Sequence, residues 1–106
     1  MAITFEYKGN DYTLEFTRDS IKQMERAGFS YSQVEEKPYT SLMTLFKGAF
    51  LAHHPRVSQT TIDEIWDNLG DKEGMFEVLA NLYNEPLEAM MAEPEEGKKI
   101  MWKVTK

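Results

Sequence analysis

The segment ITFEYKGNDYTLEF, residues 3–16, decides the fold of this chain. Large apolar residues occupy every second position on both sides of a central Gly9-Asn10 pair, as in two half-buried strands. Glycine and asparagine both tolerate the positive φ angles of a two-residue hairpin turn. We therefore predict a β-hairpin that turns at Gly9-Asn10. In the predicted register Tyr7 pairs with Tyr12, Phe5 with Leu14 and Ile3 with Phe16.

This register places the large apolar side chains of the hairpin on one face. A two-stranded ribbon alone is only marginally stable in water, so helices must cover that face. The rest of the sequence has apolar residues at helical spacing, and we predict an α+β fold with about five helices after the hairpin. The first expected helix is capped by Ser20 and Gln23 and ends at Gly28, and one helical turn follows within 29–38. A central helix is expected over about 39–53. Two more helices follow, one capped by Ser58 or Thr60 and one capped by Asp71.

Two residues, Pro86 and Gly48, are unfavourable inside a helix, so their presence needs an explanation. Pro86 lacks the N–H group that an interior helical position would use, so it either kinks the last helix or begins a further short one that carries Leu87, Met90 and Met91. Gly48 in the central helix costs about 1 kcal/mol relative to alanine. Its presence suggests that another backbone passes close by.

Length and composition predict one compact domain. The chain has 106 residues, of which 42% are hydrophobic, and a chain of this length can bury one core but not two. We expect the α+β domain to cover residues 1–93. Residues 94–106 are polar and unpatterned and are expected to form a flexible tail, whose Ile100, Met101, Trp102 and Val104 are available to a partner.

The charge balance excludes several partners. Eighteen acidic residues against twelve basic ones give a net charge of −6, which opposes binding to a phosphate backbone, so no nucleic acid is expected. Without cysteine there is neither a disulfide framework nor a thiolate metal site. No run of about 20 apolar residues predicts a membrane span, and the first residues do not resemble a signal peptide. We therefore expect a cytoplasmic protein with no membrane partner.

His53 and His54, before the acidic residues Asp63 and Glu64, are the only group in the sequence that suggests an active site. Adjacent helical residues point about 100° apart, whereas a metal pair on a helix needs i, i+3 or i, i+4 spacing. We interpret the two imidazoles as donors to the carbonyl groups that end the central helix. Phosphate loops, nucleophile elbows and paired-histidine zinc motifs do not occur, so we expect no enzyme activity, no cofactor and no metal.

Methionine is frequent in the later helices, with seven methionines in the chain. Its flexible side chain suits surfaces that accept varied apolar partners, and the neighbours Met90 and Met91 cannot both face one core. We therefore predict an apolar groove for a helical partner, and self-association that competes with it. The predicted lining residues are Phe46, Phe50, Met75, Phe76, Leu79, Met90 and Met91.

Three segments resemble one protein family. They are ITFEYKGNDYTLEFTRDSIKQMERAGF, EEKPYTSLMTLFKGAFLAHHPRVSQTTIDEIWD and LANLYNEPLEAMMAEPEE, which together span about residues 3–96. They are similar to short tail-assembly chaperones of long-tailed phages and prophages of Gram-positive bacteria. The resemblance implies a non-enzymatic protein of the host cytoplasm that binds the helical tape-measure protein, keeps it soluble, helps recruit tail-tube subunits and is absent from the finished virion. It supplies no catalytic residues.

Two other classes of protein fit the composition. One is a structural piece of the virion, such as a tail-completion or connector subunit, which would be detected in purified particles. The other is a small acidic inhibitor that mimics nucleic acid in the basic cleft of a host protein. Such an inhibitor needs its carboxylates on one face, whereas here they are scattered along the sequence.

Overall fold

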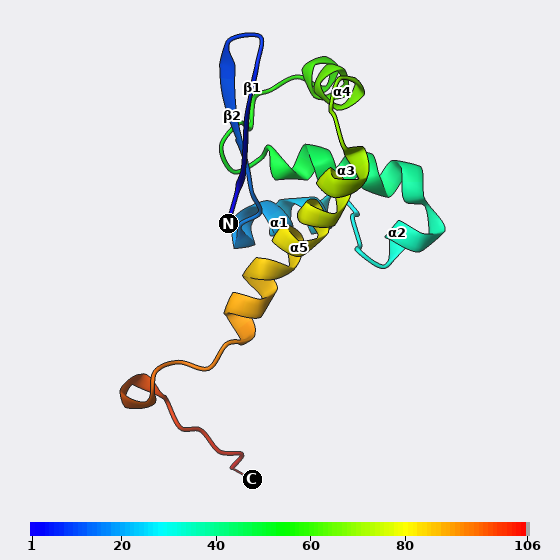
Figure 1. The fold of residues 1–106 in the computed structure, drawn as a ribbon. Coiled ribbons are helices and arrows are strands. Elements are labelled where there is room, and N and C mark those ends of the chain that lie inside the picture. The colour runs from blue at the N-terminus through cyan, green and yellow to red at the C-terminus, as the bar shows by residue number, and fades with distance from the viewer. Residues whose placement is uncertain (106) are drawn as a thin grey trace.

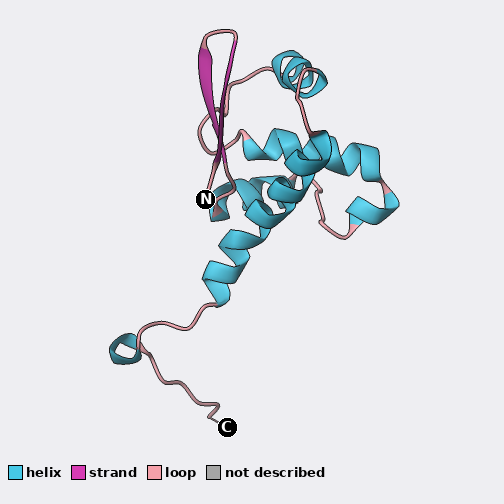
Figure 2. Cartoon of the chain, viewed as in Figure 1, coloured by secondary structure: helices cyan, strands magenta, loops and turns pink. Residues whose placement is uncertain are grey.

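The computed structural model describes residues 1–105 and has the predicted α+β fold. An antiparallel hairpin precedes five helices (Figures 1 and 2). The elements are β1 (Ile3–Tyr7), β2 (Asn10–Leu14), α1 (Arg18–Arg26), α2 (Gln33–Glu36), α3 (Pro38–Ala49), α4 (Gln59–Asp67), α5 (Lys72–Met91) and a single 3₁₀ turn, η1 (Glu96–Lys98). None of the helices in residues 1–105 combines the length and apolar character that crossing a membrane requires.

The hairpin turns one residue earlier than predicted. Lys8 and Gly9 form the turn with φ angles of 50° and 80°, because both central positions of this turn type require positive φ. The predicted partners on β2 were therefore wrong by two residues. Since a shift of two residues keeps every side chain on its own face, the apolar face is the predicted one. The observed pairs are Tyr7 with Asn10, Phe5 with Tyr12 and Ile3 with Leu14.

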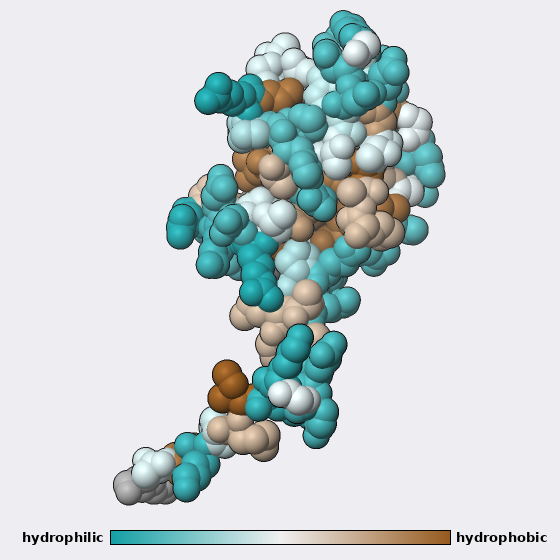
Figure 3. Space-filling model, turned by 90° about the vertical axis from the view of Figure 1, so that its left-hand side faces the viewer, coloured by the Kyte–Doolittle hydropathy of each residue, from teal (hydrophilic) through white to brown (hydrophobic). Residues whose placement is uncertain are grey.

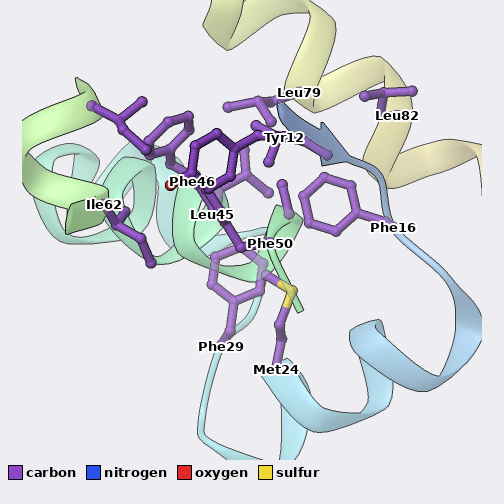
Figure 4. Packing of buried hydrophobic residues seen from close by; sticks show 13 residues of the cluster. Tyr12, Phe16, Met24, Phe29, Leu45, Phe46, Phe50, Ile62, Leu79 and Leu82 are labelled. Atoms are coloured by element: carbon purple, nitrogen blue, oxygen red, sulfur yellow. The ribbon is translucent and has the colours of Figure 1, made fainter. Parts of the chain in front are cut away.

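A single core lies between the hairpin and the helices, with α3 at its centre (Figure 4). Leu45, Phe46 and Phe50 are buried there, and the apolar face of the hairpin packs against them. The rings of Phe46 and Phe50 meet edge to face, with centroids 5.2 Å apart. Ala49 of α3 is buried with them. The rest of the chain contributes Tyr12, Leu14, Phe16, Met24, Phe29, Ile62, Ile65, Leu79 and Leu82.

Helix α1 begins three residues before the position predicted from its cap. Thr17 is the N-cap, and its side chain and that of Ser20 each accept a hydrogen bond from the backbone N–H of the other residue. Gly28 follows the helix with a φ of 100°, as its predicted role as a stop requires. The group that packs closely against Gly48 of α3 is the side chain of Met24 in α1, not a backbone as predicted, because a Cβ atom at Gly48 would collide with the sulfur of Met24.

Helix α5 is one continuous helix, and Pro86 lies inside it rather than at the start of another. Asp71 caps it as predicted, with a side-chain oxygen 3.1 Å from the N–H group of Gly74. Its first half packs on the core through Leu79 and Leu82. Its last turns extend beyond the core and lead into the tail, so the described chain is elongated, 57 by 32 by 25 Å (Figure 1).

Candidate partner-binding surface

His53 and His54 follow α3, and both imidazoles reach strand β2. The backbone N–H of Thr13 donates a hydrogen bond to Nε2 of His54 over 3.0 Å. Nε2 of His53 lies 2.6 Å from Oε1 of Glu15. The interpretation that the two rings bond the carbonyl groups at the end of α3 is therefore wrong, because the turn after α3 directs them to the strand. Among residues 1–105, no group of three or more His, Cys, Asp or Glu side chains has the geometry of a metal site.

The tip of the hairpin is held against α4 by a second polar contact. Nζ of Lys8 lies 2.5 Å from Oε1 of Glu64 and 5.5 Å from the centroid of the Tyr7 ring. Hydrogen bonding to Lys8 holds the pKa of Glu64 below its ordinary value, and the same bond raises the pKa of Lys8. Burial, with the nearby carboxylate of Glu64, raises the pKa of Tyr7. These groups attach the hairpin to α4. They are polar and paired with one another, so they do not form an apolar surface for a partner.

Three of the predicted groove residues belong to the core. Phe46, Phe50 and Leu79 have exposed fractions of 0%, 1% and 0%. They fill the space between the hairpin and the helices, so a partner cannot contact them on the folded domain (Figure 4). Their assignment to an open groove is wrong for this reason.

The other four predicted residues lie at the two ends of α5. Met75 and Phe76 are half-buried near its beginning, where Met75, Val78 and Ile3 surround a hollow beside β1. Met90 and Met91 are exposed in its last turn. At 1.5 Å per helical residue, about 22 Å separate Met75 from Met90. The structure therefore does not bring the seven predicted residues together as one groove.

An apolar stripe remains on the projecting end of α5. Leu87, Met90 and Met91 have exposed fractions of 57%, 60% and 72%. They occupy positions i, i+3 and i+4, which share one side of a helix. Apolar side chains mark the narrow stem between the body of the molecule and the tail (Figure 3). We call Leu87, Met90 and Met91 the α5 stripe.

The tail and the start of α3 expose further apolar side chains. Ile100, Met101, Trp102 and Val104 of the tail are almost fully exposed. Tyr39, in the first turn of α3, is 82% exposed. Sequence reasoning did not single out Tyr39, although its place directly after Pro38 indicated the first turn of a helix, where side chains have few neighbours.

Comparison with known proteins identifies one family. Residues 1–106 match the model of a family described as a domain of unknown function, DUF5055. No curated protein and no solved structure matches the chain.

Proposed function

We propose that this chain, which belongs to the DUF5055 family, is a phage tail assembly chaperone that binds helical segments of a tape-measure protein. In this role it keeps the long partner soluble in the host cytoplasm and helps recruit tail-tube subunits. The observation that carries the proposal is the α5 stripe, an apolar surface held clear of the core. The resemblance of residues 3–96 to such chaperones supports the identity of the partner.

The shape of the α5 stripe suits a helical partner. Side chains at i, i+3 and i+4 form a ridge that fits the groove between side chains of a second helix. Two of the three residues are methionines, whose flexible side chains adapt to different apolar sequences. A tape-measure protein has many helical segments of similar but unequal sequence. A contact made by flexible methionine side chains can bind several of them.

The charge of the chain suits the same task. The net charge of −6 makes copies of the protein repel one another and so favours solubility. A tape-measure protein bound by several copies would carry their negative charge, and such complexes would repel one another in the same way. The proposal includes no enzyme activity, cofactor, metal, nucleic acid or membrane.

Co-expression with the tape-measure protein tests the proposal. We expect the wild type to keep that protein soluble and to be recovered with it in a pull-down. The double variant Met90→Asp/Met91→Asp should fold but lose both effects, because the last turn of α5 makes no core contact that these changes would remove. Tyr39→Asp is the matched control, since it also removes an exposed apolar side chain and should keep binding.

Two results would contradict the chaperone proposal. The first is a tape-measure protein that stays insoluble and unbound with the wild type. The second is equal binding by the wild type and the double variant, which would remove the α5 stripe as the contact surface.

A structural virion subunit is the second candidate function. The projecting tail, with four exposed apolar side chains, favours it because such an extension can connect neighbouring subunits. Mass spectrometry of purified particles separates the two functions. Stoichiometric amounts of the chain in finished particles would support the connector, and its absence would support the chaperone.

A further inference from the structure

Strand β1 has an open outer edge, whereas the outer edge of β2 is occupied. On β2, the N–H of Thr13 donates to Nε2 of His54. Directly after β2, the N–H of Glu15 donates to the carbonyl oxygen of Ala49 over 3.1 Å. On β1, no hydrogen bond joins the outward backbone groups of Thr4 and Glu6 to any other part of residues 1–105. A free edge of this kind is a template for a further strand.

The tail contains a segment with the pattern of β1 itself. Ile100-Met101-Trp102-Lys103-Val104 and Ile3-Thr4-Phe5-Glu6-Tyr7 both place large apolar residues at their first, third and fifth positions, and they differ at the second, where the tail has Met101 and β1 has Thr4. Within the described residues the tail segment lies in no helix or strand, and its apolar side chains are exposed. A period of two with bulky and β-branched residues is the pattern of a strand that needs a partner.

The fourth positions of the two segments carry opposite charges. Glu6 stands on the polar face of the hairpin, which also carries Asp11, and Lys103 stands at the corresponding place in the tail. Among residues 1–105, neither Glu6 nor Lys103 forms an ion pair, whereas Lys99 lies 2.9 Å from Glu96. Opposite charges on adjacent strands stabilise their pairing.

From these observations we propose that residues 100–104 of one copy add to the β1 edge of a second copy as a third strand. Trp102 then lies beside Phe5, and Ile100, Trp102 and Val104 extend the face formed by Ile3, Phe5 and Tyr7. The hollow between Ile3, Met75 and Val78 receives the tail residue that lies beside Ile3. Lys103 joins the acidic face with Glu6.

The position of the tail favours a second copy over the same chain. Helix α5 carries the tail away from the hairpin of its own molecule (Figure 1). A segment with the pattern of a strand projects from one molecule, and the open edge of a second molecule has a matching pattern. Two identical chains can therefore pair by placing the tail of one on the sheet edge of the other. This inference goes beyond the proposed function and does not depend on it.

Complementation between two variants tests the exchange. The wild type should self-associate in light scattering as its concentration rises. Trp102→Lys removes the donor strand, and Thr4→Pro removes an outward N–H of the acceptor edge, so each variant alone should be monomeric. Mixed together, they should form a 1:1 heterodimer, because the tail of the Thr4→Pro chain still fits the intact edge of the Trp102→Lys chain.

A second pair of variants keeps the test valid if Thr4→Pro does not fold. Glu6→Lys should prevent self-association by placing like charges together, and Lys103→Glu should restore it in a mixture of the two proteins. A monomeric wild type at high concentration, or mixtures that remain monomeric, would overturn the proposal. A monomer in which the Thr4 amide is protected from hydrogen exchange would also overturn it, since the tail would then occupy the edge of its own chain.

Discussion

The N–H group of Thr13 donates a hydrogen bond to Nε2 of His54, which is 41 residues later in the sequence. The imidazole thus accepts a hydrogen bond from the outer edge of β2, as a carbonyl group of a neighbouring strand would. Because the backbone N–H is the donor, Nε2 carries no proton in this bond. The His54 ring also contacts the Tyr12 and Phe50 rings, with centroids 5.1 and 6.4 Å away, so it belongs to both the edge and the core.

Replacing His54 should test the value of this bond. His54→Phe keeps an aromatic ring but leaves the part-buried Thr13 N–H without an acceptor, so the free energy of unfolding should fall by about 1–3 kcal/mol. Urea denaturation measures the change. His53→Gln is the matched control, because His53 is exposed and its replacement should have a much smaller effect. Equal stability of His54→Phe and the wild type would mean that water or another group satisfies Thr13.

The ion pair between Lys8 and Glu64 should make a small contribution to the free energy of unfolding, and this contribution should depend on pH. The pKa of Glu64 is lowered from 4.5, so its contribution is complete above that value and disappears as the pH falls through the lower folded value. The pKa of Lys8 is raised from 10.5, so its contribution disappears only as the pH rises above that value. Glu64→Gln should therefore lower the melting temperature slightly at pH 7 and leave it unchanged in strong acid.

Salt provides the control for this pair. Both groups are exposed, so 1 M salt should remove most of the difference between Glu64→Gln and the wild type at pH 7. A difference that persists in salt or in strong acid would show that Glu64 acts through packing instead.

The contact between Met24 and Gly48 should appear as a coupling in a double-mutant cycle. With Met24 in place, Gly48→Ala forces the sulfur of Met24 to move and brings little or no gain in stability. In the Met24→Ala background the obstacle is absent, and the same change should stabilise the protein by up to about 1 kcal/mol through helix propensity. Denaturant unfolding of the four proteins measures the cycle, and equal effects of Gly48→Ala in the two backgrounds would refute the steric explanation.

Oxidation should distinguish exposed methionines from buried ones. Peroxide should convert Met90, Met91 and Met101 to sulfoxides well before Met24, whose exposed fraction is 4%. Peptide mass spectrometry measures the order of conversion. Because a sulfoxide is polar, protein oxidised at Met90 and Met91 should also lose the proposed binding to a tape-measure protein, while its far-ultraviolet circular dichroism stays unchanged. Early oxidation of Met24 would contradict the burial of α1 against α3.

The architecture could be predicted because its signals are local. Alternation of apolar residues identified the hairpin, and Asp71 identified the start of α5. Of the two predicted caps for α4, Ser58 and Thr60, the structure has Ser58. The start of α1 was missed because its capping box has serine at the third position, where glutamate or glutamine is usual. The turn was misplaced by one residue because Lys8, not an expected turn residue, adopts positive φ.

The surface was harder to predict than the architecture. Helix α3 is apolar on most of its sides, so its sequence does not show which side chains the hairpin and the other helices cover. Phe46 and Phe50 were misassigned for this reason. The sequence indicated that one of Met90 and Met91 lies at the surface, because neighbouring helical positions point in different directions, and the structure exposes both. The predicted hairpin implied two outer edges, but sequence patterns alone do not show that His54 and Ala49 occupy the edge on the β2 side and leave that of β1 open.

The bond between Thr13 and His54 also sets an order of events during synthesis. A ribosome makes the hairpin before the helices, yet the group that closes the edge of β2, His54, and the core residues of α5, Leu79 and Leu82, come tens of residues later. At about 5–20 residues per second, the nascent hairpin therefore waits several seconds for its supports. During that interval both of its edges are open, and the tail segment, which is made after His54, emerges only after the group that closes one of them.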